Sequence, residues 1–95
     1  MIYSDTQEYI KELNRQGFAG YSDWRLPTLE EAISLMEREE KNGLYIDPLF
    51  DSRQWRIWTA DKESASRAWV VLFDLGYCNR RDLYHGYDVF VRAVR

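Results

Sequence analysis

The chain has 95 residues and a mass of 11.4 kDa, which is the size of one small domain. Hydrophobic residues make up 45% and aromatic residues 16% of it, a composition that excludes intrinsic disorder. The only cysteine, Cys78, excludes an internal disulfide, and a net charge of −3 without a basic cluster argues against nucleic acid as the main partner. We therefore expect a single domain over residues 1–95.

Membrane and targeting signals are missing from this sequence. No apolar stretch reaches the roughly 18–20 residues that span a bilayer, and we expect no membrane contact. Residues 1–13 lack the basic start and apolar middle of a signal peptide. Taken as a whole protein the chain would be cytoplasmic; taken as part of a longer one, its compartment stays open.

The first predicted element is a helix that starts at Ser4 or Asp5 and ends before Gly17. Either residue can cap the helix, because each has a Gln or Glu three residues later that would complete a capping box. Gly17 stands where a left-handed C-cap residue belongs. The apolar stripe of this helix consists of Tyr9, Ile10 and Leu13.

A second helix is predicted from residue 29 to residue 41. Pro27 blocks helix upstream, and Thr28 with Glu31 forms the T-x-x-E pattern of a capping box. Charged residues 37–41 would cover the solvent side, and Asn42-Gly43 would end the helix. The apolar face recurs at helical spacing in Leu29, Ala32, Ile33 and Met36.

The rest of the chain is predicted to form short strands. Residues 55–59 and 68–73 are rich in β-branched and aromatic residues. Residues 74–76 would form a tight turn into a strand at 77–80, and residues 88–95 would form a final strand. Two helices followed by short antiparallel strands predict the α+β class.

Several of these segments carry a family resemblance. The motifs "GYSDWRLPT", "IDPLF", "WTA", "AWVVLF" and the closing "VRAVR" resemble the Lcl C-terminal domain family of bacteria and phages. The resemblance implies a C-type-lectin-like fold, with two helices packed on a small, mostly antiparallel twisted sheet. Relatives usually begin with an extra strand or two, whereas only residues 1–3 precede the first helix here. Either this is a minimal version of the domain, or the strand comes from an upstream segment or from another subunit. An open edge beside the last strand would favour pairing with another chain, as in a homo-oligomer.

The resemblance also implies structural roles for the scaffold. Trp24 would fill the junction between helices and sheet, and Arg25 would extend its guanidinium under the sheet to carbonyls or a carboxylate. The alternative is that Arg25 binds an anion. The expected structural residues are Trp24, Arg25, Pro27, Thr28, Trp58, Trp69 and Phe73, together with Val71, Val91 and Val94.

Enzymatic and metal chemistry find little support. The related formylglycine-generating enzymes use paired cysteines, whereas Cys78 is alone and is expected to be a half-buried apolar residue. A Cys78–His85 dyad in a small enzyme is the remaining catalytic alternative, without an orienting third group. We therefore expect no enzyme activity and no cofactor. We also expect no metal site, because the candidate acidic ligands are scattered along the sequence: Asp47, Asp51, Asp61 and Asp74.

The last 26 residues have an unusual composition. Residues 70–95 contain no Lys, Glu, Gln, Met or Trp, although these types supply 20 of the first 69 residues and would be expected seven or eight times. Some C-type-lectin-like proteins are diversified by retroelements that randomise adenines in Asn codons, and such codons cannot become any of these five residues. The other interpretation is that strands disfavour Lys, Glu and Gln. Both interpretations stay open.

The same segment predicts a binding surface around residues 74–90. Rigid aromatic side chains mixed with small polar ones are typical of such surfaces. We expect a non-enzymatic domain that presents this surface to a protein or other macromolecular ligand; the alternative is a structural accessory module of a larger bacterial protein. Phe90 is expected to be buried. The candidate ligand-binding residues are Tyr77, Asn79, Arg80, Arg81, Asp82, Tyr84, His85, Tyr87 and Asp88.

Overall fold

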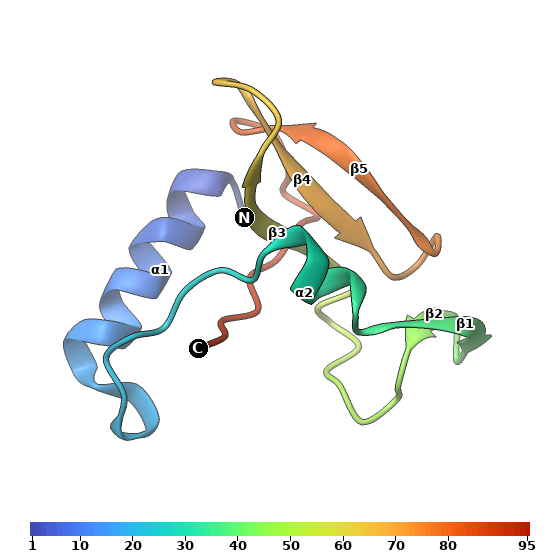
Figure 1. The fold of residues 1–95 in the computed structure, drawn as a ribbon, viewed down its shortest axis with the longest axis horizontal. Helices are drawn as coiled ribbons and strands as arrows, with labels where there is room; N and C mark the ends of the chain where they lie inside the picture. Colours follow the sequence, from blue (N-terminus) through green and yellow to red (C-terminus); the bar gives the residue numbers. More distant parts are fainter.

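A computed structural model describes residues 1–95 and combines two α-helices with two antiparallel sheets (Figure 1). The predicted α+β class is confirmed, and the C-type-lectin-like arrangement stays a prediction. The structure also confirms that strands form where they were predicted, at 55–59, 68–73 and 77–80, although their exact ends differ. The elements are α1 (Tyr3–Gln16), the 3-10 turn η1 (Phe18–Gly20), α2 (Leu29–Ile33), β1 (Met36–Lys41), β2 (Leu44–Ile46), β3 (Arg56–Lys62), β4 (Arg67–Leu72) and β5 (Tyr77–Asp82).

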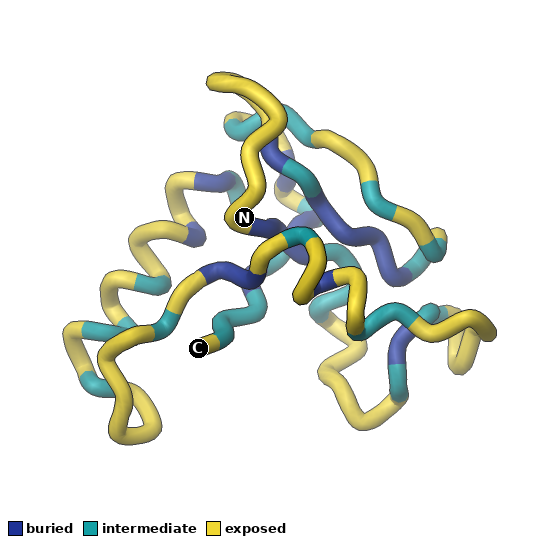
Figure 2. The backbone as a smooth tube through the Cα atoms, in the orientation of Figure 1, coloured by how far each residue is buried: buried dark blue, intermediate teal, exposed yellow.

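The larger sheet, in the order β3-β4-β5, separates two apolar clusters. Residues of β4 alternate between them, because successive side chains of a strand point to opposite faces. Val70 joins the cluster around Trp58, and Val71 joins the cluster around Phe73. All four side chains are almost completely buried, and the dark segments of Figure 2 gather on β3 and β4. This sheet is therefore the centre of the fold.

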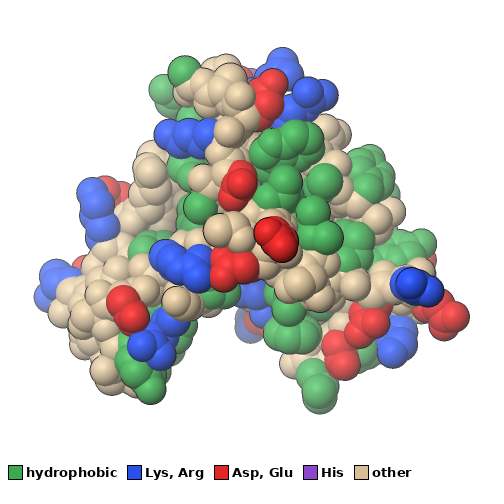
Figure 3. Space-filling model, in the orientation of Figure 1, with side chains coloured by type: hydrophobic (Ala, Val, Ile, Leu, Met, Phe, Trp, Pro, Cys, Tyr) green, Lys and Arg blue, Asp and Glu red, His purple; other side chains and the backbone are tan.

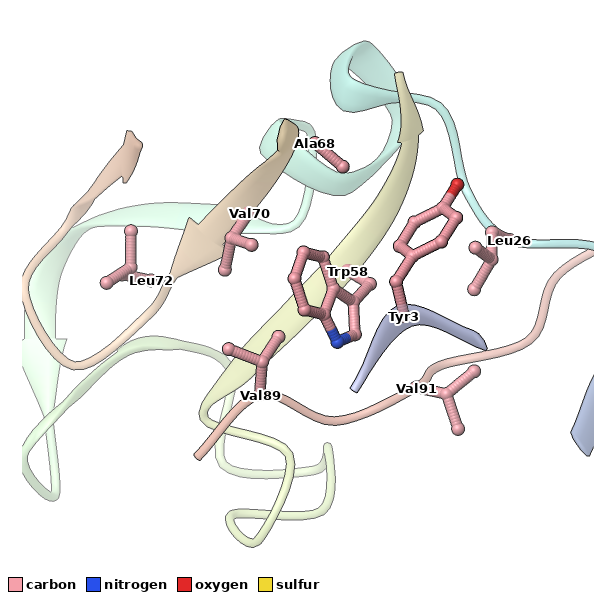
Figure 4. Packing of buried hydrophobic residues seen from close by; sticks show 8 residues of the cluster. All are labelled: Tyr3, Leu26, Trp58, Ala68, Val70, Leu72, Val89 and Val91. Atoms are coloured by element: carbon pink, nitrogen blue, oxygen red, sulfur yellow. The ribbon is translucent and has the colours of Figure 1, made fainter. Parts of the chain in front are cut away.

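Helix α1 begins at Tyr3, so the predicted start at Ser4 or Asp5 is wrong. Its N-cap position is Ile2, without a side-chain cap. Tyr3 is buried with its ring edge-on to Trp58, at 5.3 Å between ring centroids (Figure 4). Packing of this ring draws Tyr3 into the first turn, ahead of the polar cap candidates. The predicted end is confirmed, since Gly17 adopts the left-handed conformation with φ +63°.

The helix predicted over residues 29–41 is wrong beyond residue 33. Its capping box is confirmed: Glu31 N–H donates to Thr28 Oγ1 (3.1 Å), and Thr28 N–H donates to the Glu31 carboxylate (2.8 Å). After α2, however, the chain forms the β1–β2 hairpin. Its turn is Asn42-Gly43, with φ +55° and +84°. Two positive φ values at Asn-Gly favour a hairpin turn, which outweighs the helical spacing of the apolar residues.

The strand predicted over residues 88–95 is not continuous. Phe90 forms a parallel bridge with Ile57, and Val94 forms an antiparallel bridge with Arg25. The segment changes partners between these two points, so no uniform ladder forms. Phe90 is half-buried where burial was expected, whereas Val91 is buried. No strand pairs with the outer edge of β5.

Candidate binding surface

Residues 83–88, which we name the tyrosine loop, follow β5 and are held by backbone hydrogen bonds at their start. Leu83 N–H donates to the Ser66 carbonyl (2.9 Å), and the Leu83 carbonyl accepts from Tyr3 N–H (3.1 Å). The carboxylate of Asp82 accepts from Tyr84 N–H at 2.8 Å, which fixes the first bend. The start of the loop is therefore attached by hydrogen bonds to two other elements, α1 and the β3–β4 turn.

The end of the loop is fixed by Gly86 and the first residue of the chain. Gly86 has φ +132°, and a Cβ added there would lie 2.7 Å from the Trp58 ring, so only glycine allows this contact. The indole N–H of Trp58 donates to the Met1 carbonyl at 2.8 Å. The Met1 nitrogen donates to three carbonyl oxygens, those of Gly86 (3.1 Å), Tyr87 (3.3 Å) and Val89 (3.0 Å).

Three side chains point outward from this fixed backbone. Tyr84 is 73% and Tyr87 83% exposed, and His85 is exposed as well. None of the three makes a side-chain hydrogen bond or ion pair within the chain. Tyr77 is half-exposed at the opposite end of β5. Within the predicted surface of residues 74–90, the most exposed aromatic residues thus lie in the tyrosine loop, with Tyr77 about one strand length away.

An ion-pair network includes Asp88, the last residue of the tyrosine loop. Arg56 donates to Asp74 (3.1 and 2.8 Å) and to Asp88, and Arg81 donates to Asp88 (2.9 Å). Burial raises the pKa of Asp88, but the charges of Arg81 and Arg56 outweigh it and hold this pKa below its usual range. Hydrogen bonding to Asp74 raises the pKa of Arg56. Arg81 and Asp88, predicted as ligand contacts, are therefore already paired.

Arg56 is a member of this network that was not predicted from the sequence. The available signal was a charged residue between the aromatic and apolar residues Trp55 and Ile57, which predicts a partner for a partly buried charge. Its two carboxylate partners are 18 and 32 residues away along the chain, so spacing could not identify them.

The remaining polar candidates lie along β5. The Arg80 guanidinium lies over the Trp69 ring at 5.6 Å and 3.9 Å from the Glu63 carboxylate. The Asn79 side-chain oxygen accepts from Arg80 N–H at 2.8 Å. Arg80 and Asn79 are both exposed, so both remain accessible to a ligand.

The structure does not bring Cys78 and His85 together. Cys78 packs against the Phe73 cluster at the start of β5, and the strand then runs about 13 Å from Cys78 to Asp82. His85 lies beyond that far end, where its N–H donates to the Asp82 carbonyl (3.2 Å).

The acidic residues that were considered as metal ligands lie apart. No group of three or more His, Cys, Asp or Glu side chains is arranged to hold a metal ion. Asp51 pairs with Arg53, Asp74 with Arg56, and Asp61 accepts from the N–H of Leu29.

Neither helix combines the length and the apolar character that a membrane-spanning helix requires.

Trp24 and Arg25 each stabilise a local segment, but neither lies at the position that was expected. The Trp24 indole donates to the Phe18 carbonyl (3.0 Å) and contacts the rings of Phe18 and Tyr21 near the end of α1. The Arg25 guanidinium is 44% exposed and lies on the surface instead of under the sheet. It forms a double hydrogen bond with Glu31 (2.7 and 2.8 Å), so its expected carboxylate belongs to the capping box of α2.

The other expected structural residues are distributed over the scaffold. Pro27 is buried, and its carbonyl accepts from Ala60 N–H at 2.8 Å. Trp69 is half-buried, and its carbonyl accepts from the Thr59 hydroxyl at 2.8 Å.

The family of this chain follows from its similarity to known sequences. No curated protein and no solved structure matches the chain. The model of one family, described as the Lcl C-terminal domain, matches residues 1–95, which is the whole sequence. The chain therefore belongs to the Lcl C-terminal domain family.

Proposed function

We propose that this chain is a non-enzymatic binding domain whose tyrosine loop contacts a protein or another macromolecular ligand. The observation that carries the proposal is the contrast between a fixed loop backbone and the free side chains of Tyr84, His85 and Tyr87. Tyrosine supplies contact area at low cost in conformational entropy, and a preorganised loop lowers that cost further. The separation of Cys78 from His85 supports a role without catalysis.

Affinity capture with two matched variants tests this function. The triple variant Tyr84→Ser, His85→Ser, Tyr87→Ser should keep its free energy of unfolding within about 1 kcal/mol, because surface substitutions usually cost little. It should lose partners that the wild-type domain captures from bacterial lysate or medium. The control, Tyr9→Ser with Leu49→Ser, removes exposed apolar groups elsewhere and should retain those partners.

Two results would contradict the proposal. An identical set of captured proteins for wild type and triple variant would remove the loop as the contact surface. Unfolding of the triple variant would favour the alternative of a structural accessory module, which the description of the family as a C-terminal domain also supports.

We also propose that retroelement diversification shaped this surface. The missing residue types in residues 70–95 support it, and so does the exposure of Leu75, Tyr77, Tyr84 and Tyr87. The ion pairs reduce the number of positions that can vary freely, because a change at Asp74 or at Asp88 would remove one of the two partners of Arg56. The DNA around the gene should contain a reverse transcriptase and a near-copy of the 3′ coding end, with adenines at the tyrosine-loop codons. A neighbourhood with neither would contradict this.

A further inference from the structure

Strand β1 has a free edge on a projecting hairpin. The β1–β2 hairpin extends from the side of the molecule opposite α1 (Figure 1). The backbone of β1 forms hydrogen bonds to only one other strand, β2. The outer edge of β1 therefore has unpaired N–H and C=O groups. A hairpin of two strands is marginally stable in water, and an open edge is a template for another strand.

The charges of β1 lack partners within the chain. Residues 37–41 read Glu-Arg-Glu-Glu-Lys, and none of them forms an ion pair, whereas eight of the 13 Lys and Arg residues of the protein do. Acidic and basic side chains lie close together on this hairpin at the right of Figure 3. All five are exposed, so they are available to a partner.

This charge pattern is complementary to itself. If two copies of β1 pair antiparallel about Glu39, Glu37 faces Lys41 and Arg38 faces Glu40, and the twofold axis doubles both pairs. This register has one repulsive pair, Glu39 with its own copy, whereas a shift by one residue in either direction places two Glu–Glu pairs opposite each other and loses the Glu37–Lys41 and Arg38–Glu40 pairs. The register centred on Glu39 is therefore the one that the charges select.

Apolar surface adjoins the same edge. A shallow groove of about 410 Å³ begins at Met36 and continues along Ile33, Tyr45 and Leu75. Ile33 is 40% and Leu75 48% exposed. A second chain paired to β1 would reach this groove at the start of the strand, which would add apolar contact to the backbone hydrogen bonds of a short strand.

We propose that β1 pairs antiparallel with β1 of a second copy of this chain, joining two hairpins into a four-stranded sheet. The pairing is independent of the ligand proposed above, because the tyrosine loop lies on another element. Sedimentation equilibrium from about 10 µM to about 1 mM measures the dimer, a range suited to a small interface.

A charge-exchange experiment tests the register. Lys41→Glu gives acidic residues at positions 37 and 41, and Glu37→Lys gives basic residues at both; each variant alone should dimerise at least about 10-fold more weakly than wild type. Their equimolar mixture should recover wild-type affinity, because each Lys then faces a Glu. Glu39→Gln should strengthen the wild-type dimer by removing the repulsion at the axis.

The controls separate this proposal from misfolding and from the ligand proposal. Glu8→Lys with Lys11→Glu, on α1, should leave dimerisation unchanged, and far-UV circular dichroism should match wild type in every variant. A wild-type chain that stays monomeric near 1 mM would overturn the proposal, and so would single variants that dimerise like wild type. Partner capture by the tyrosine loop is read separately in the same variants.

Discussion

At the scale of single residues, Gly86 determines how closely the tyrosine loop approaches the core. Gly86→Ala should destabilise the fold by about 1–3 kcal/mol, because the added methyl group would overlap the buried Trp58 ring. Urea unfolding measures the change. Gly20→Ala is the control, since Gly20 also has a positive φ (+85°) but open space around it. Equal losses in the two variants would show that backbone conformation alone requires Gly86.

The ion pairs of Asp88 should make the free energy of unfolding depend on pH in the acidic range. Its pKa is lowered in the folded chain, so the stabilisation is complete above the unfolded value of about 3.9 and is lost as pH falls through the folded value. Asp88→Asn should cost about 1 kcal/mol at pH 7, because the pairs with Arg56 and Arg81 are partly exposed. The difference between wild type and variant should stay constant down to about pH 5 and shrink below about pH 4. A difference independent of pH would contradict the ion pairing.

At the scale of elements, α2 depends on its cap. It has only five residues, too few for stability from helix propensity alone. Thr28→Ala should therefore cost about 1 kcal/mol, whereas Thr28→Ser, which keeps the accepting hydroxyl, should cost much less. Thermal unfolding of the three proteins compares them. Equal losses for Ala and Ser would mean that the threonine methyl group, and not the hydrogen bond, matters.

Elements with a single dominant signal were predictable from sequence. Strand β4 is covered on both faces and reads as an apolar run, and Thr28-x-x-Glu31 is a local signal that needs no tertiary partner. The stretch from residue 36 to residue 41 continues the helical spacing but is extended, because the Asn42-Gly43 turn pairs it with β2. The exposed tyrosines were suggested by composition, whereas the Arg56 network needs contacts between distant segments.

At the scale of the whole molecule, order should decrease outward from the central sheet. Most buried side chains belong to β3, β4 and the segments that cover them, whereas α1 buries only Tyr3 and Thr6 (Figure 2). Amide exchange in β4 should therefore require global unfolding, with a free energy equal to that from urea unfolding. The second half of α1 and the hairpin should exchange through smaller openings.

Amide exchange in the β1–β2 hairpin tests this prediction most directly. In dilute solution the amides of β1 that point away from β2 have no acceptor and should exchange fast, as should the unpaired amides on the outer edge of β5. Near 1 mM, pairing with a second copy should slow those amides of β1, and it should also slow the amides of β4, because dimerisation raises the free energy of global unfolding. Nuclear magnetic resonance at two concentrations measures both. Strong protection of β1 in dilute solution would contradict a free edge, since a chain without a partner has nothing to bind these groups.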